Sequence, residues 1–262
     1  MLASSIPSPA SAEGGEVNIL VLRENGAGSA ATAQSYIDTL MSHVAKVNGW
    51  PSAKGSYHTK RNAAKKYIDA SKPHYGILSL SAFLALRKPL GLKVLGQAEV
   101  EGGGGAQYYV VSKTQSDLAG CKGKTLATNH GSDSVFIDKV VAAGAFTLAD
   151  FTIVTTTRPV QTLKKVLGDE AECGLIDDAQ MADLHNLEGG AAVHPVWFSA
   201  TMPPMAVVAF DSAPADEAKT FKAKLGEVCT GDGERSCAQA GLKSLKDGDD
   251  AAYAKVVAAY GG

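Results

Sequence analysis

The stretch DLAGCKGKTLATNHGSDS, residues 117–134, decides the fold of this chain. Its β-rich run Lys124–Thr128 predicts a buried strand, and the glycine-led loop Gly131–Ser134 then opens a helical pattern that extends to Ala143. A strand that passes through a short loop into a helix is the repeating unit of an α/β sheet. The unpaired N–H groups at such a helix start also favour contact with an anion.

The same alternation of strand and helix patterns runs along the chain in both directions, which indicates an α/β fold built on parallel sheets. The predicted strands span residues 17–22, 75–80, 92–98, 108–112, 124–128, 151–155, 173–176, 193–198 and 206–210. The predicted helices span residues 30–49 after a Ser29 cap, 60–68 after a Thr59 cap, 81–86, 132–143, 159–167, 178–184, 216–229 and 249–260.

Two chain crossings divide these elements into two lobes. The run Gly102–Gly105 cannot pack a core and loses most entropy on ordering, so we place a domain boundary there. Met202-Pro203-Pro204 brings the chain back. We therefore expect a discontinuous first lobe of residues 17–104 plus 200–262 and a second lobe of residues 105–199. Each lobe is expected to hold a mostly parallel sheet flanked by helices, and a two-strand hinge joins them.

Residues 1–16 precede the first predicted strand and are expected to form a disordered tail or the remnant of a leader. Met1 to Ala12 is rich in Ser, Pro and Ala, without the cationic start or the apolar run of a complete signal peptide. Ala10-Ser11-Ala12 still has the small-x-small pattern of a secretory cleavage site. Both interpretations stay open.

Four cysteines allow three disulfide pairings. Cys229 and Cys237 flank a turn-rich segment that favours a short-range disulfide. We pair Cys121 with Cys173 because both are expected near the starts of neighbouring strands. Disulfides of this kind are typical of an oxidising compartment, whereas the spacing fits no zinc site.

A series of motifs gives the chain a resemblance to a known family. Residues 117–127 and 131–134 resemble the "DLKGK" strand and the "GSTS" loop of the phosphate/phosphonate-type periplasmic substrate-binding proteins of ABC transporters. The acidic and glycine-containing strand 172–177, the proline-containing crossing 201–204 and the C-terminal pattern 241–260 follow in the family's order. The resemblance covers nearly the whole chain.

The resemblance implies a two-lobed type II periplasmic-binding fold that closes around a small ligand in the cleft between its lobes. It also implies an extracytoplasmic or periplasmic location, a membrane permease complex as partner, and a monomeric state. The strand pattern leads to the same cleft, because open α/β sheets bind ligands beyond the carboxyl ends of their strands.

The candidate ligand-binding residues lie on the loops that such a cleft collects. Two loops from different lobes offer hydroxyl and backbone donors between a strand and a helix. Thr156 and Arg158 are rim candidates, Asp177 ends the strand shared with the family, and Ala82-Phe83 stands where the family has Ala-Tyr. The predicted set is Ser79, Ser81, Ala82, Phe83, Gly131, Ser132, Asp133, Ser134, Thr156, Arg158 and Asp177.

Opposed donors favour a small oxyanion, with phosphonate or phosphate as the best match. Two departures from the family keep other ligands open: Asp133 puts a carboxylate in the middle of the loop, and Phe83 lacks the tyrosine hydroxyl. An aminophosphonate-like zwitterion could place its ammonium on Asp133. The apolar loop Leu80–Leu86 would also suit a lipid or another hydrophobic ligand, and a ligand-sensing domain could use the same closing motion.

The remaining patterns exclude several classes of protein. No GxSxG, HExxH or Walker motif is present, so we expect a binding protein and not an enzyme, without cofactor or metal. A net charge of -2 without a basic, aromatic-rich run argues against nucleic acid. The longest apolar runs fall short of the roughly 20 residues that span a bilayer, so no stable membrane insertion is expected.

Overall fold

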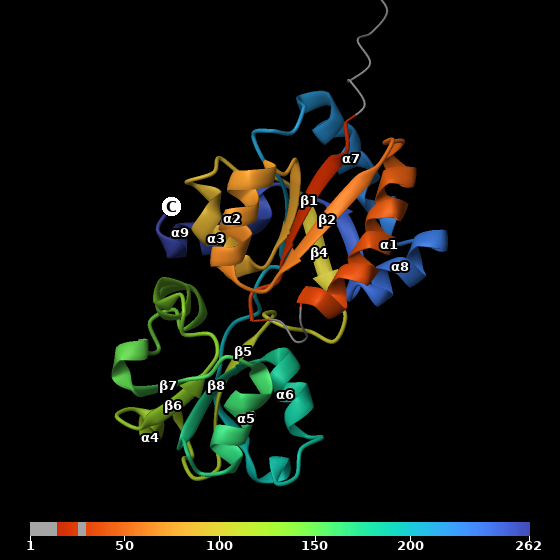
Figure 1. The fold of residues 1–262 in the computed structure, drawn as a ribbon. Helices are drawn as coiled ribbons and strands as arrows, with labels where there is room; N and C mark the ends of the chain where they lie inside the picture. The colour runs from red at the N-terminus through yellow and green to blue at the C-terminus, as the bar shows by residue number, and fades with distance from the viewer. Residues whose placement is uncertain (1–14, 26–29) are drawn as a thin grey trace, which may run out of the picture.

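The computed structural model describes residues 15–25 and 30–262 and consists of two α/β lobes (Figure 1). Most of the predicted tail and the Ser29 cap lie outside the described residues. The large lobe holds a six-stranded sheet in the order β11-β4-β10-β3-β1-β2. Its strands are β1 Val17–Leu22, β2 Ala53–His58, β3 Tyr75–Leu78, β4 Lys93–Val100, β10 Met205–Ala209 and β11 Leu242–Asp247.

The small lobe holds a five-stranded sheet in the order β7-β6-β8-β5-β9. Its strands are β5 Tyr108–Ser112, β6 Thr125–Thr128, β7 Thr152–Thr155, β8 Cys173–Asp177 and β9 His194–Phe198. The chain therefore passes between the sheets after β4 and again after β9. The N–H of Met202 donates to the carbonyl of Ala106 at 2.8 Å, which ties the two crossings together as a hinge. The lobe boundaries at 104/105 and 199/200 remain our proposal.

Both sheets are mixed, although mostly parallel sheets were predicted. β1 pairs in parallel with β2 and β3, and β6 pairs in parallel with β7 and β8. The strands that border the crossings, β4, β5, β9 and β10, pair antiparallel. Helical crossovers enforce parallel pairing only within each βα run, whereas a strand that returns from the other lobe enters in the opposite direction.

Helices cover both faces of the large sheet (Figure 1). β1 alternates accordingly: Leu20 and Leu22 pack in the cluster with α2, α3 and α9, whereas Ile19 and Val21 pack in the cluster with α1, α7 and α8. The first cluster continues into the small lobe, so apolar packing joins the lobes. The helices of the large lobe are α1 Ala30–Asn48, α2 Arg61–Ser71, α3 Leu80–Arg87, α7 Ala215–Val228, η4 Gly231–Gly233, α8 Glu234–Gln239, η5 Asp250–Tyr253 and α9 Ala254–Tyr260.

Local sequence explains the helix starts of the small lobe. Pro159 occupies the first turn of α5, and Asp177 accepts a hydrogen bond from the N–H of Gln180 as the N-cap of α6. Within the predicted helix 132–143, residues 136–141 form a short π-helix, η1, and the N–H of Phe136 donates to Asp133 Oδ1 at 3.0 Å. The helices here are α4 Leu118–Cys121, η1 Phe136–Val141, η2 Leu148–Asp150, α5 Pro159–Leu167, α6 Asp178–Leu184 and η3 Gly190–Ala192.

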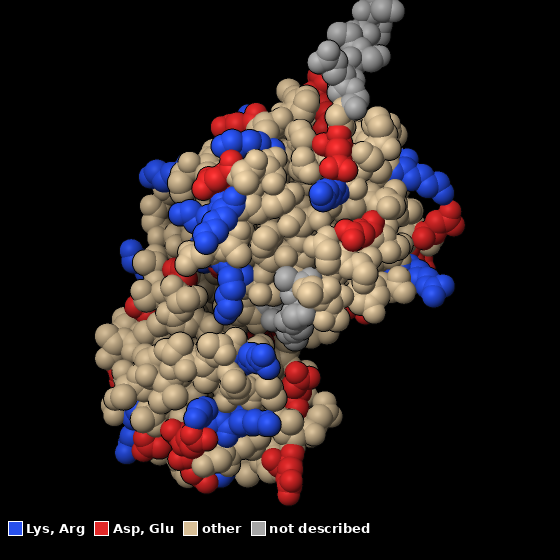
Figure 2. Space-filling model, in the orientation of Figure 1, with Lys and Arg blue, Asp and Glu red and all other residues tan. Residues whose placement is uncertain are grey.

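Both predicted disulfides are present. Cys121 bonds to Cys173 inside the small lobe, and Cys229 bonds to Cys237 between α7 and α8. No helix within residues 15–25 and 30–262 is long and apolar enough to cross a membrane. On the face that Figure 2 shows, acidic and basic side chains are intermixed over both lobes, and neither sign forms a continuous stripe.

Candidate ligand-binding site

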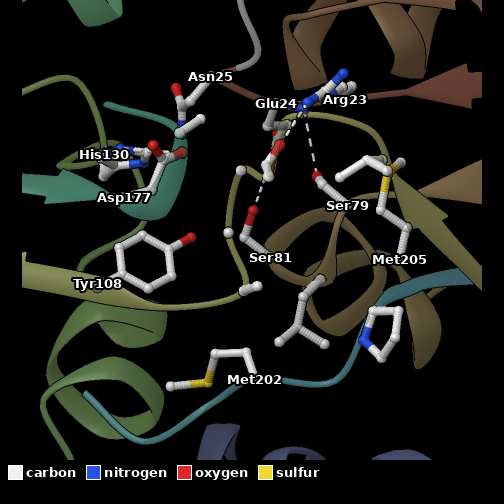
Figure 3. A pocket seen from close by; sticks show the side chains of 18 of the residues that line it. Arg23, Glu24, Asn25, Ser79, Ser81, Tyr108, His130, Asp177, Met202 and Met205 are labelled. Carbon is white, nitrogen blue, oxygen red and sulfur yellow. Dashed lines mark hydrogen bonds and ion pairs between the residues drawn. The ribbon is translucent and has the colours of Figure 1, made fainter. Parts of the chain in front are cut away.

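A cavity of about 440 Å³ lies between the two sheets and is lined from both lobes (Figure 3). The large lobe contributes the end of β1 and the start of α3. The small lobe contributes β5, the loop after β6 and the start of α6, and both crossings complete the wall. The cavity therefore lies beyond the carboxyl ends of the parallel strands, where α/β sheets collect ligands.

The large-lobe wall is built around the carboxylate of Glu24. Ser81 donates to Glu24 Oε2 at 2.8 Å, and the N–H of Glu24 donates to Ser79 Oγ at 3.3 Å. These contacts fix the loop after β1 against the start of α3. The serine positions were predicted from the sequence, whereas Glu24 was not.

Glu24 also takes part in a network of ion pairs that crosses the cleft. Arg61 at the start of α2 donates to both Glu24 oxygens at 2.7 Å and, through Nη1, to Asp133 Oδ2 at 2.9 Å. The hydroxyl of Tyr260 on α9 donates to Asp133 Oδ2 at 3.0 Å. Burial disfavours the charged guanidinium, but the two carboxylates outweigh burial and raise the pKa of Arg61. Asp133 therefore joins the lobes.

On the small-lobe side, the hydrogen bonds of Gln180 determine which ring nitrogen of His130 carries a proton. The Oε1 of Gln180 accepts the N–H of Asp177 at 3.2 Å, and its Nε2 donates to the carbonyl of Pro159 at 3.1 Å, so the amide orientation is set. The Nε2 of His130 lies 2.8 Å from that Oε1 and must donate to it. The imidazole therefore carries a proton on Nε2.

Asp177 is a buried acid in the wall of the cavity. Its Oδ1 accepts the N–H of Gln180, and its Oδ2 lies 3.9 Å from His130 Nε2. Burial raises the pKa of Asp177, although the neighbouring His130 opposes the shift. The adjacent Asp178 points elsewhere, because it accepts the N–H groups of Gly104 and Ala106 in the first crossing.

Arg23 brings a positive charge to the cavity from the end of β1. Its Nη2 donates to the carbonyl of Gly103 at 2.9 Å, so the guanidinium borders the glycine run. Gly102 to Gly105 all have positive φ values, between 70° and 118°. The glycine run is therefore a conformational requirement of the hinge that leaves room for Arg23 and Asp178.

The structure brings together five of the predicted site residues: Ser79, Ser81, Ser132, Asp133 and Asp177 all line the cavity. The other six do not line it. Ala82 and Phe83 are fully buried in the core, and Phe83 packs against Tyr253. Thr156 is buried against Thr162, whereas Gly131, Ser134 and Arg158 lie outside the lining.

Several lining residues were missed by the sequence analysis. Tyr108, Phe136 and His130 line the cavity, although the sequence analysis named none of them as ligand-binding. A positional signal existed for Arg23, Glu24 and His130, because each lies within two residues of the end of a parallel strand, β1 or β6. Arg61 and Tyr260, which contact Asp133, carry no such signal because they lie far away in the sequence.

Apolar residues form the rest of the wall. Met202, Pro203 and Pro204 come from the second crossing, and Met205 begins β10. Leu80 comes from the large lobe and Phe136 from the small lobe. Among the described residues, no group of three or more His, Cys, Asp or Glu side chains is arranged to hold a metal ion.

Solved structures share this architecture. XAC2383 from Xanthomonas citri, bound to chloride ion, has a TM-score of 0.73 and 10% identity over 93% of this chain and 97% of its own. PhnD1 from Prochlorococcus marinus in complex with methylphosphonate has a TM-score of 0.69 and 9% identity over 92% and 95%. A binding protein component of an ABC phosphonate transporter from Pseudomonas aeruginosa has a TM-score of 0.68 and 11% identity over 92% and 84%.

No family model matches the chain, and no curated protein matches it by sequence. The identities to the solved structures are low, so those structures establish the fold. The chain has the two-lobed type II periplasmic-binding fold that the motif series predicts.

Proposed function

We propose that this chain is the extracytoplasmic solute-binding subunit of an ABC importer and that it captures a small organic oxyanion of the phosphonate class. The observation that carries the proposal is the cavity between the lobes, to which Ser79 contributes from one side and Ser132 from the other. Closure of two lobes over a ligand buries it and assembles its partners from both sides. The two disulfides support an oxidising compartment.

Arg23 is the cation that we assign to the oxyanion. Its guanidinium lines the cavity beside the glycine run, and a planar guanidinium binds phosphonate oxygens in pairs. The hydroxyls of Ser79 and Ser132 add neutral donors. Arg61 is less suitable, because its guanidinium already forms ion pairs with Glu24 and Asp133.

A zwitterionic solute is the second candidate, and Asp177 favours it. The sequence predicted Asp133 as the partner of an ammonium group, but Asp133 is engaged by Arg61 and Tyr260. Asp177 instead places a buried carboxylate in the cavity wall. An ammonium group beside it would stabilise the charged form of that acid.

Isothermal titration calorimetry with phosphate, methylphosphonate and 2-aminoethylphosphonate tests the proposal. We expect Arg23→Gln to weaken phosphonate binding at least tenfold, which corresponds to about 1.4 kcal/mol, because a charged donor is lost. Arg158→Gln is the matched control, since Arg158 is exposed and outside the cavity lining. Absence of binding to all three compounds, or equal losses in the two variants, would refute the oxyanion assignment.

A further inference from the structure

The cavity is larger than an inorganic oxyanion requires. Its volume of about 440 Å³ corresponds to roughly 15 water-sized groups. An oxyanion with five heavy atoms fills about a third of that space. The size matches pockets for organic ligands, which start at about 300 Å³. The ligand should therefore bring a substituent of its own into the remaining volume.

The wall is divided into a polar and an apolar part. In Figure 3, His130 and Asp177 lie on the left of the cavity and Ser79 and Ser81 lie nearer the middle. Met205 lies on the right. Met202 borders the lower side of the same space. Pro204, Leu80 and Phe136 add apolar surface from three different elements.

The apolar part is held in place by the core beneath it. The hydroxyl of Tyr253, a fully buried residue, hydrogen-bonds the carbonyls of Met205 at 3.0 Å and Pro204 at 3.2 Å. The N–H of Met202 is bonded to the carbonyl of Ala106. The backbone that carries these side chains is therefore preformed, and an apolar group can bind without ordering it. Flexible methionine side chains adapt to groups of different shape.

We infer that the ligand is an amphiphilic organic solute whose apolar substituent lies against Met202, Pro204 and Met205 while its charged group faces Arg23 and the serines. The inference rests on the proposed function for the charged group and adds the class of substituent. Inorganic phosphate and methylphosphonate would then bind more weakly than longer homologues.

A homologous series from methyl- to butylphosphonate measures this directly by calorimetry. Each buried methylene should lower the Kd about fourfold, and the full series about 60-fold. Met202→Gln and Met205→Gln should each reduce the ratio of butyl to methyl affinity at least fivefold. Met181→Gln on α6 is the matched control, because Met181 lies outside the cavity lining, and it should leave the ratio unchanged.

The outcomes separate this inference from the proposed function. Phosphonates that bind without a gain along the series would overturn the apolar substituent and leave the oxyanion site intact. If no phosphonate binds, the oxyanion site fails, and fluorescence of 1-anilinonaphthalene-8-sulfonate tests the apolar wall alone. Enhancement that wild type and Met181→Gln share but Met202→Gln lacks would support the wall. Equal enhancement in all three proteins, or none, would overturn it.

Discussion

Arg61 and Asp133 lie 72 residues apart in the sequence, yet the guanidinium Nη1 of the first is 2.9 Å from the carboxylate Oδ2 of the second. Arg61 belongs to α2 of the large lobe, and Asp133 precedes η1 of the small lobe. Both side chains are mostly shielded, with exposed fractions of 24% and 8%. A charged hydrogen bond in such surroundings contributes about 1.5–3 kcal/mol, so this pair stabilises the closed arrangement of the lobes.

Asp133→Asn is expected to favour opening of the lobes. The amide keeps an acceptor for the N–H of Phe136 but loses the charge that attracts Arg61. We expect a Kd for methylphosphonate about tenfold higher, since closure and binding share one equilibrium. Small-angle X-ray scattering should show a larger radius of gyration in the same variant.

Asp169→Asn is the control for this change. Asp169 pairs with Lys113 within the small lobe, and its side chain is 72% exposed. Losing an exposed pair changes stability by about 1 kcal/mol or less and should not alter closure. If Asp133→Asn scatters like the wild type and binds equally well, the ion pair does not govern closure.

The glycine run should tolerate alanine at one position and not at the next. Gly102 and Gly103 both have positive φ, so alanine costs about 1 kcal/mol of strain at either position. A Cβ at Gly102 meets nothing within 4 Å, whereas a Cβ at Gly103 lies 2.4 Å from Asp178 Oδ2. Asp178 cannot move without leaving the N–H groups of Gly104 and Ala106.

We therefore expect Gly103→Ala to lower the free energy of unfolding by about 1–2 kcal/mol more than Gly102→Ala. Urea denaturation followed by circular dichroism measures both variants. Equal losses would mean that strain alone matters and that the contact with Asp178 is not a constraint.

The order of most strands and helices could be predicted, because the apolar runs in their sequences indicate buried elements, but β2 and β11 were missed. α5 and α6 begin and end where the pattern places them. β2 was missed because its sequence, Ala53–His58, contains lysine, glycine and serine, and only pairing with β1 makes it a strand. Gly55 is needed there, since a Cβ would lie 2.4 Å from Ile37 of α1.

The site could be predicted in part for the same reason. Ser79 and Ser132 follow strands and Asp177 ends one, and position along a βα unit places them at the cleft. Position along the chain does not reveal which side chains contact each other across the cleft. The engagement of Asp133 by Arg61 and Tyr260 depends on how the two lobes pack, and no local pattern encodes that packing.

The two disulfides should differ in their contribution to stability. Cys121–Cys173 spans 52 residues and Cys229–Cys237 spans 8, so the entropy model gives about 4 and 2.5 kcal/mol respectively. We expect the Cys→Ala pair at 121 and 173 to lose more stability in urea than the pair at 229 and 237. The opposite order would show that the shorter loop carries native-state contacts that chain entropy does not describe.

Asp177→Asn is expected to stabilise the protein at neutral pH. Asparagine is as good an N-cap as aspartate, so α6 keeps its first hydrogen bond. Burial raises the folded-state pKa of Asp177 above its ordinary value of about 3.9. The favourable contribution of the neutral acid is fully present below that ordinary value and is lost as pH rises through the folded-state pKa.

The variant should therefore have a higher Tm than the wild type at pH 7, and the difference should shrink as the pH falls toward 4. Thermal unfolding by calorimetry at both pH values measures it. Asp183→Asn removes one negative charge from an exposed residue of the same helix, which also borders the cavity, and serves as the control for loss of charge without burial. A variant that is less stable than the wild type at pH 7, or a difference that does not depend on pH, would mean that His130 and the cap compensate for the buried charge.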